Sequence, residues 1–293
     1  MDWVRRSNIV PVGVVVLAII VLWYAFAIVL NAPWQQSVYA RGEIVDVPIG
    51  QYLTDLYSQQ RPVLPAPHQV ATEFWNSVFM ADPSTPRSLI FHAWITLSAT
   101  ALGFVFGTVL GIGLAVLIVH NRAMDRSLMP WIIASQTIPV LATAPMIVVV
   151  LNSVGLSGLI PKALISTYLS FFPVVVGMVK GFRSPEAIHL DLMRTYNASG
   201  AQLFWKLRWP AAVPFLFASM KVGVAASLVG AIVGELPTGA AGGLGSRLLA
   251  GSYYGQTTQI WAALLMAAGL SAGLIFLIAA VERFTGRAMG APA

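Results

Sequence analysis

The sequence predicts an all-α integral membrane protein with six transmembrane helices. Hydrophobic residues make up 57% of the 293 residues and charged residues only 10%, and the mean hydropathy is +0.77. Soluble domains carry about 25% charged residues, so this composition is that of a membrane protein. The apolar runs are long and continuous, which favours helices over the short alternating strands of a closed barrel.

Six apolar runs are long enough to cross a bilayer as helices. They cover about residues 9–30, 89–119, 128–152, 160–179, 211–234 and 260–281. A cleaved signal peptide is the alternative for the first run, but a signal h-region covers only about 7–15 residues and this run is longer. We therefore expect a transmembrane helix there.

The runs divide the chain into four parts. Residues 1–30 are expected to form an amino-terminal cytoplasmic tail and the first helix, and residues 31–88 an extracytoplasmic loop. Residues 89–283 would form the core, with five further helices and a charged loop at residues 181–210 between helices 4 and 5. Residues 284–293 would be a cytoplasmic tail.

Basic residues near the ends of the runs predict the orientation, because they are enriched on the cytoplasmic side. With a cytoplasmic amino terminus, eleven Lys and Arg residues fall on the cytoplasmic side and five on the opposite side. We therefore expect a multi-pass protein of the cell (inner) membrane with both termini in the cytoplasm. The net charge of +6 lies mainly in these loops, so it does not indicate nucleic-acid binding.

Small residues inside three of the runs predict close helix packing. Gly103, Gly107 and Gly111 recur at every fourth position, which leaves one helix face without side chains. The same spacing is found at Ala226, Gly230 and Gly234, and at Gly269 and Gly273. Another helix backbone can approach each of these faces closely.

The third run combines prolines with polar side chains. Pro130, Pro139 and Pro145 each remove a backbone hydrogen bond, so we expect a kinked helix. Polar groups are costly in lipid, so the polar side chains should face the interior of the bundle. Whether they line a pathway or pair across helices stays open. The candidate pathway-lining residues are Gln136, Thr137, Thr143 and Ser227.

The charged loop from Lys180 to Pro210 is helix-prone and lies between two apolar runs. Its charged and apolar residues predict two short helices with a break at Asn197-Ala198-Ser199-Gly200, since Asn and Gly accept left-handed backbone angles. Such an element could transmit force to a cytoplasmic partner. The alternative is a solvated loop whose basic residues only set the topology.

Several kinds of chemistry lack their sequence signature. The chain has no cysteine, and its four histidines are scattered without metal-ligand spacing, so we expect no metal site. No phosphate-binding loop occurs, and acidic residues are nearly missing from the middle of the runs. We therefore expect a non-catalytic subunit, and the energy for any active transport must come from a separate protein.

The charged loop resembles the EAA loop of permease subunits of bacterial ABC importers, whose pattern is E-A-A, three residues, G, nine residues, I, one residue, L-P. Asp191-Leu192-Met193 stands at the E-A-A position, and Asn197 at the Gly position. Leu207, Trp209 and Pro210 follow, and only Pro210 is identical to the pattern. The segment N-A-S-G-A-Q-L-F-W-K-L-R-W-P-A-A-V-P is similar to that of the nitrate/sulfonate/taurine-type permeases, and the resemblance covers about Val63 to Arg283.

This resemblance implies a transmembrane permease subunit of an ATP-driven importer. Its partners would be ABC ATPase subunits, a second permease subunit (identical or a sister chain), an extracytoplasmic substrate-binding protein and the lipid bilayer. ATP and Mg would be bound by the ATPase, and this chain would hold no cofactor. The solute would be a nitrate-, sulfonate- or taurine-like anion, or a small heterocycle such as a pyrimidine vitamin precursor.

The resemblance also implies roles for individual residues. The helix before Asn197 would be the coupling helix, and Tyr196 and Phe204 would pack the two short helices together. Glu235 and Arg247 would serve gating or the binding-protein side. The implied contacts with the ATPase are Asp191, Thr195, Tyr196, Asn197, Ala198, Ser199 and Phe204.

Lys221 is the one basic residue expected inside a span. A lysine facing lipid at mid-depth would cost about 2.5–3.5 kcal/mol. Either residues Ala211 to Ser219 lie along the membrane interface, or Lys221 faces a cavity of the permease dimer, which would suit an anionic solute.

Two other functions compete with the importer subunit. A stand-alone carrier or channel would ordinarily keep acidic residues at mid-depth, which this chain lacks. A membrane scaffold without a transport role would not need the polar third run.

Overall fold

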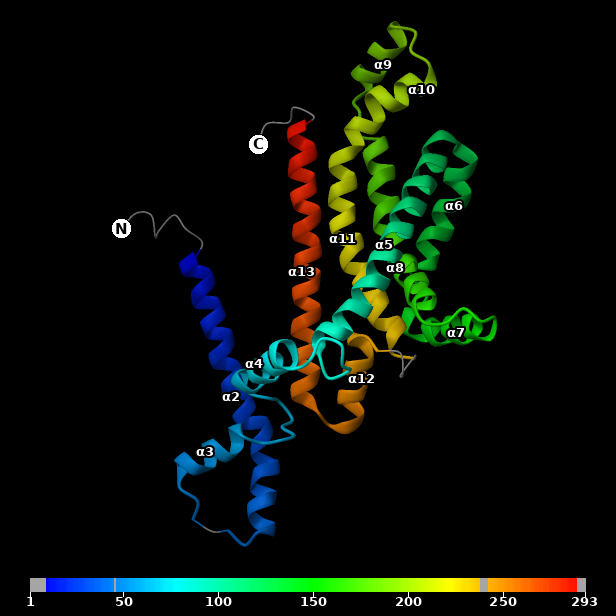
Figure 1. Cartoon of the computed structure of the whole chain (residues 1–293). Coiled ribbons are helices and arrows are strands. Elements are labelled where there is room, and N and C mark those ends of the chain that lie inside the picture. Colours follow the sequence, from blue (N-terminus) through cyan, green and yellow to red (C-terminus); the bar gives the residue numbers. More distant parts are fainter. Residues whose placement is uncertain (1–8, 45, 238–241, 289–293) are drawn as a thin grey trace. The chain divides into compact units, whose positions relative to one another are not determined.

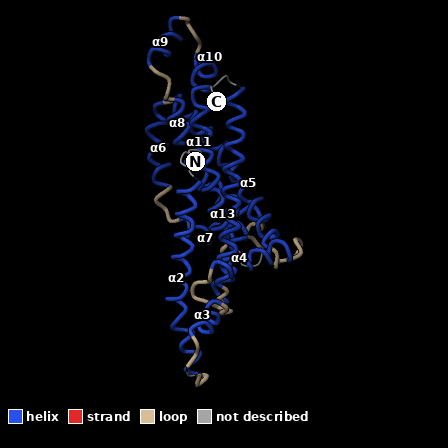
Figure 2. Tube along the Cα trace, turned by 90° about the vertical axis from the view of Figure 1, so that its left-hand side faces the viewer, coloured by secondary structure: helices blue, strands red, loops and turns tan. Residues whose placement is uncertain are grey.

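The computed structural model describes residues 9–44, 46–237 and 242–288, and these form helices joined by short connections, with no strand among them (Figures 1 and 2). The expected tail segments 1–8 and 289–293, which include Arg5 and Arg6, lie outside the described residues, as do residues 238–241 of the Gly-rich loop. Two compact units are present. The first covers the described residues up to Ile90 and Arg247–Leu265, and the second covers Phe91–Ser246 and Met266 onward.

Three helices form the centre of the second unit: α5 (Leu89–His120), α8 (Leu159–Phe182) and α11 (Trp209–Glu235). They match the second, fourth and fifth predicted runs. Glycines allow the close contacts, since a Cβ atom at Gly111 would lie 2.8 Å from Val174 and one at Gly230 would lie 2.7 Å from the Cα of Ser166. The close packing predicted for Gly103, Gly107, Gly111, Gly230 and Gly234 is therefore confirmed.

The contacts also give the directions of these helices. Gly103 faces Ser166 and Gly111 faces Val174, so α5 and α8 run in the same direction. Gly234 faces Lys162 and Gly181 faces Ala212, so α11 runs antiparallel to α8. In contrast to the prediction, a Cβ atom at Gly269 or Gly273 would meet none of the described residues within 4 Å, so no close packing is seen there.

The third predicted run is not one kinked helix but two helices at nearly a right angle. The helices α6 (Arg122–Ser135) and α7 (Val140–Ser153) meet at a bend of 96°, and Pro139 is the N-cap of α7. Each has 14 residues, or about 21 Å at 1.5 Å per residue, which is too short to cross a bilayer core of about 30 Å. The described residues thus contain five spanning helices, or six if this bent pair counts as one span.

The first unit shows more helix than we predicted. The first helix, α2 (Ile9–Arg41), continues well beyond the expected end at residue 30. The expected loop at 31–88 also contains α3 (Ile49–Tyr57), α4 (Pro67–Trp75) and the π-helical turn η1 (Asn76–Met80). The extension of α2 is held by buried amides, because Asn31 donates to the carbonyl of Leu64 at 2.8 Å and Gln59 donates to Gln35 at 2.8 Å.

The last two helices are α12 (Leu244–Tyr254) and α13 (Thr257–Ala288). Within the second unit α13 packs on α11, where Ile278 joins a cluster with Phe217 and Val224. Beside this cluster the ammonium of Lys221 pairs with the carboxylate of Glu282. A neighbouring helix of the same chain thus supplies the counter-charge of Lys221. Both alternatives expected for this residue stay predictions.

Candidate functional site

The charged loop begins with the short helix α9 (Ala187–Thr195) and then breaks as predicted. Asn197 has a φ of +50°, a left-handed angle that Asn tolerates, and its N–H donates to the carbonyl of Arg194 at 2.8 Å. Ser199 starts the next helix with a capping box, since Gln202 accepts from the Ser199 N–H at 2.9 Å. The backbone angle at Asn197 and the cap at Ser199 together define the turn.

The second short helix is not separate from the membrane span, in contrast to the prediction. Helix α10 (Gly200–Leu203) continues through the π-helical turn η2 (Phe204–Arg208) into α11. Gly200–Glu235 is therefore one helical stretch of 36 residues. Any displacement of the turn acts directly on this helix.

Helix α9 has no buried residue and presents an apolar stripe to its surroundings. Ile188 and Leu192 of the helix and Tyr196, its C-cap, follow one another at four-residue spacing, and their exposed fractions are 71%, 52% and 77%. Such a spacing places side chains on one helix face. Asp191 lies beside the stripe and pairs with Arg194 at 3.0 Å. This face is chemically suited to a partner protein.

Phe204 is placed differently from the other predicted ATPase contacts. Its side chain is buried in an aromatic cluster, with ring centroids 5.2 Å from His120, 5.3 Å from Phe182 and 6.1 Å from Trp209. Tyr196 is exposed, so the two side chains do not pack the short helices together as expected. Phe204 instead fixes the base of the loop to the ends of α5 and α8.

Among the predicted pathway residues, Ser227 is fully buried inside the bundle. Its hydroxyl donates to the carbonyl of Thr100 at 2.8 Å, and the hydroxyl of Ser166 lies 2.6 Å from that of Ser227. Ser227 therefore joins α5, α8 and α11, and in this structure it lines no open surface. A pathway role for Ser227 stays a prediction, and within this chain its hydroxyl serves a close helix contact.

The other three candidates lie at or near the bend between α6 and α7. Gln136 is the C-cap of α6, and its amide donates to the Ser135 hydroxyl at 3.1 Å. The hydroxyls of Thr137 and Thr143 donate to nearby backbone carbonyls, those of Ala134 and Val140. These bonds are local, so a pathway role for the three residues stays a prediction.

Glu235 ends α11 and is fully buried. The Thr96 hydroxyl donates to its carboxylate at 2.9 Å, and the Gly245 N–H donates to it at 2.8 Å. A buried carboxylate of this kind presents no surface to a binding protein. Next to Glu235, the side chains of Lys162, Thr96 and His92 bind the backbone of residues 242–244. The sequence predicted no role for these three residues, although Lys162 stands out as a cation near the start of an apolar helix.

Arg247 belongs to the first unit, as does the carboxylate of Glu73. Burial lowers the pKa of the Arg247 guanidinium below its ordinary value, and the Glu73 carboxylate opposes this shift. Arginine remains protonated at physiological pH after such a shift. A role at the binding-protein side stays a prediction for this residue.

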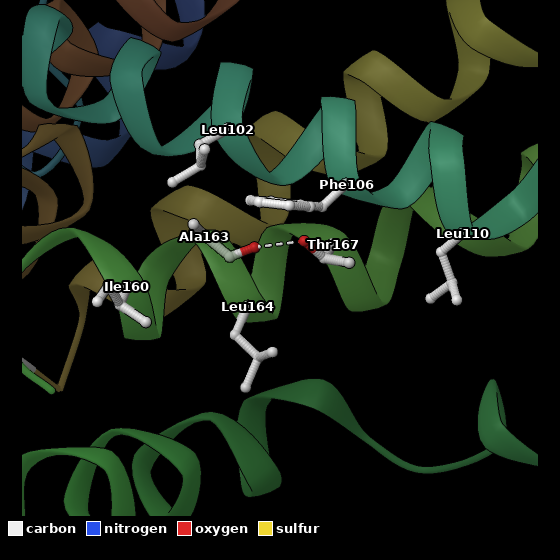
Figure 3. A pocket seen from close by; sticks show the side chains of 7 residues that line it. All are labelled: Leu102, Phe106, Leu110, Ile160, Ala163, Leu164 and Thr167. Carbon is white, nitrogen blue, oxygen red and sulfur yellow. Dashed lines mark hydrogen bonds between the residues drawn. The ribbon is translucent and has the colours of Figure 1, made fainter. Parts of the chain in front are cut away.

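A groove of about 540 Å³ lies along α5 and α8 in the membrane-spanning part of the second unit (Figure 3). The hydroxyl of Thr167 is the polar side chain there, and it donates to the carbonyl of Ala163 at 2.8 Å. The apolar lining residues are Leu102, Phe106, Leu110, Ile160, Ala163 and Leu164. Because its lining is almost entirely apolar, this groove does not fit the recognition of a polar solute. No cluster of potential metal ligands occurs in the described parts of the chain.

The geometry thus defines a multi-pass helical membrane protein with an exposed, helix-based loop at residues 181–210. Residues 107–290 match the family described as the inner membrane component of binding-protein-dependent transport systems. The chain belongs to this family and is a permease subunit of the ABC importer class.

Two relatives illustrate the family. The formylaminopyrimidine transport permease protein ThiX of Halalkalibacterium halodurans is 34% identical over 184 residues, which are 62% of this chain and 68% of the relative. The riboflavin transport system permease protein RibX of Chloroflexus aurantiacus is 32% identical over 224 residues, which are 75% of this chain and 78% of the relative.

A solved structure, an inward-facing conformation of the MetNI methionine ABC transporter, has a similar fold. The match has a TM-score of 0.59 at 19% identity and covers 67% of this chain and 94% of the other. At this identity the likeness concerns the fold, and it supports the predicted all-α membrane architecture.

Proposed function

We propose that this permease subunit contributes half of a solute pathway and receives its energy from separate ABC ATPase subunits that bind helix α9. The observation that carries the proposal is the exposed stripe of Ile188, Leu192 and Tyr196 on a helix without any buried residue. Large apolar side chains exposed together at helical spacing favour a protein partner.

The direction of the chain across the membrane follows from the same loop. Arg183 and Arg194 lie at the end of the bundle that carries α9, and Arg183 pairs there with Asp125 at 2.8 Å. Positive charge marks the cytoplasmic side, so we place α9 in the cytoplasm. The amino and carboxyl termini are proposed to lie on that side too, in the inner membrane.

The pathway itself requires a second permease subunit and an extracytoplasmic binding protein. The groove along α5 and α8 is apolar, so we place the pathway for a polar solute between two permeases. The chain would take no part in catalysis and hold no cofactor, and ATP and Mg would be bound by the ATPase.

The solute class is proposed from the relatives. Two relatives at 34% and 32% identity carry the name of a nitrogen heterocycle, a formylaminopyrimidine or riboflavin, whereas the nitrate and sulfonate permeases that match are only 26% and 25% identical. On this difference in identity we favour a small heterocycle over the nitrate- or sulfonate-like anion. The second argument against the anion is that Lys221, the cation inside α11, is already neutralised by Glu282. Competition of a pyrimidine against sulfonate for uptake into cells that depend on this transporter would decide between the two.

The docking proposal is tested by replacing Ile188 and Leu192 with serine and purifying the chain with its co-expressed ATPase. Both side chains are exposed, so the fold should persist while ATPase retention falls sharply. Val63→Ser is the matched control, because Val63 is an equally exposed apolar residue that we place on the other side of the membrane. Full ATPase retention by the Ile188→Ser, Leu192→Ser variant would refute docking through α9.

A further inference from the structure

Four backbone groups in a row, in residues 242–245, are bound by side chains from the helix bundle. The N–H of Gly243 donates to Nδ1 of His92 at 3.0 Å, and the N–H of Leu244 donates to the Thr96 hydroxyl at 2.9 Å. The N–H of Gly245 donates to the Glu235 carboxylate at 2.8 Å. The carbonyl of Gly242 accepts from the Lys162 ammonium at 3.0 Å.

We call His92, Thr96, Lys162 and Glu235 the clamp. Its members come from three helices: α5 supplies His92 and Thr96, α8 supplies Lys162, and α11 supplies Glu235. Lys162 and Glu235 are both buried, and each binds the backbone of the same short segment. Each N–H of residues 243–245 has its own acceptor, and the Glu235 carboxylate binds the last of the three.

The glycines of residues 242–245 lie so close to the clamp that no side chain would fit at Gly243 or Gly245. A Cβ atom at Gly243 would overlap the carboxylate of Glu235, and one at Gly245 would lie 2.9 Å from the Cβ of Glu235. Gly242 and Gly243 also have positive φ angles of +77° and +117°. Because glycine has no side chain, the backbone at these positions can approach Glu235 directly.

The clamp lies at the opposite ends of the helices that carry residues 181–210, which we call the docking loop because it contains α9. Glu235 ends the helical stretch that begins at Gly200, directly after the turn of the docking loop, and this stretch is roughly 54 Å long at about 1.5 Å per residue. Lys162 lies near the start of α8, whose other end, Phe182, leads into the same loop. The two charged members therefore lie at the far ends of the two helices that carry the docking loop. The segment that they hold opens α12, whose residues from Arg247 onward belong to the first unit.

We propose that Glu235, Thr96 and Lys162 are positioning residues that hold the start of α12 on the helix bundle, and that the transporter needs this hold to convert binding-protein engagement into ATP hydrolysis. The proposal rests on the proposed function as an ABC permease. The clamp itself is a property of this chain and can be measured without any partner.

Amide hydrogen exchange of residues 242–246, in the full chain in lipid nanodiscs, measures the clamp directly. Thr96→Val keeps the shape of the side chain but removes the hydroxyl that links Leu244 to Glu235. It should speed exchange of these amides by about tenfold or more, because a hydrogen bond to a charged network is lost. Thr96→Ser keeps the hydroxyl and should stay within about twofold of the natural chain.

Thr108→Val is the matched control, since Thr108 lies on the same helix and its hydroxyl has no hydrogen-bond partner among the described residues. The control should leave exchange at 242–246 unchanged. Equal exchange in Thr96→Val and Thr108→Val would show that no clamp exists.

The functional arm measures ATPase activity of the assembled transporter with and without the binding protein. Thr96→Val and Glu235→Gln should retain the ATPase subunits and basal hydrolysis, but lose most of the stimulation by the binding protein, while Thr96→Ser and Thr108→Val keep it. A purely structural role would lower assembly and leave the ratio of stimulated to basal activity intact. That outcome, or full stimulation in Thr96→Val, would overturn the positioning role. If the natural chain retains no ATPase at all, the proposed function fails, and the exchange comparison still decides the clamp.

Discussion

The two ends of the α8–α11 pair differ in how they satisfy their polar and apolar groups. At one end, the side chains of α9 are exposed and the hydrogen bonds of the turn are made within a few residues, such as those of Asn197 and Ser199. At the opposite end, residues 242–245 are bound by buried side chains from three helices. The side chains of α9 therefore remain available to bind another protein, and we call this the open end. The polar side chains at the other end, the clamped end, are already bound within the chain.

Glycine substitutions should show this difference most strongly. Gly243→Ala puts a Cβ into the Glu235 carboxylate at a φ of +117°, so we expect a loss of about 2–6 kcal/mol of stability from strain and overpacking. Gly200→Ala, at the start of α10, has nothing within 4 Å and should be neutral or slightly stabilising. Thermal unfolding in detergent measures both. Equal unfolding temperatures for the two variants would contradict the contrast between the ends.

Within the docking loop, a buried and an exposed aromatic residue give the next largest effect. Phe204→Ala should cost about 3–5 kcal/mol, because it removes a ring from the cluster with Phe182 and Trp209. Tyr196→Ala should change stability by less than about 0.5 kcal/mol, since its side chain is exposed. Denaturant midpoints would compare them. A larger loss in Tyr196→Ala than in Phe204→Ala would mean that the loop base is packed differently.

The central helices were predictable from the sequence. The length of an apolar run indicates whether a helix can cross the membrane, and the spacing of its glycines indicates which face packs closely on another helix. The runs at 89–119, 160–179 and 211–234 match α5, α8 and α11 closely. The break at Asn197 was also predictable, because few residues other than glycine accept a positive φ. These features are encoded locally.

Other features depend on partners far away in the sequence. The 96° bend between α6 and α7 could be expected as a kink from Pro139, but its size depends on how the two helices pack. The counter-ion of Lys221 lies 61 residues away at Glu282, and the clamp joins Thr96 to Glu235 over 139 residues. No local pattern reports such pairs, so the sequence predicted that Lys221 and Glu235 were unusual but not what they bind.

Asn197 provides a smaller and more selective test of the open end. Asn197→Val should strain the turn by about 1–2 kcal/mol, because a β-branched residue resists the left-handed angle. The variant should insert normally and lose its ATPase on purification, whereas Asn197→Gly should behave like the natural chain. Retention of a full complement of ATPase by Asn197→Val would reduce the loop to a topology signal.

The smallest effect on stability is expected at Leu192. This side chain is about half exposed, and α9 contains no buried residue. Leu192→Ala should therefore shift the free energy of unfolding by less than about 0.5 kcal/mol. The same variant should bind the ATPase more weakly, as measured by subunit recovery at increasing salt and detergent. A destabilised chain with unchanged ATPase recovery would place Leu192 in an internal contact instead.

Site-directed crosslinking tests the docking role of α9 most directly, because the natural chain contains no cysteine. A photoreactive maleimide on Tyr196→Cys should crosslink to the ATPase subunit in membranes that contain the assembled transporter. The same reagent on Ser252→Cys, an exposed position in α12, should not. Crosslinking to the ATPase from position 252 and not from position 196 would contradict both the proposed orientation and the assignment of α9 as the docking helix.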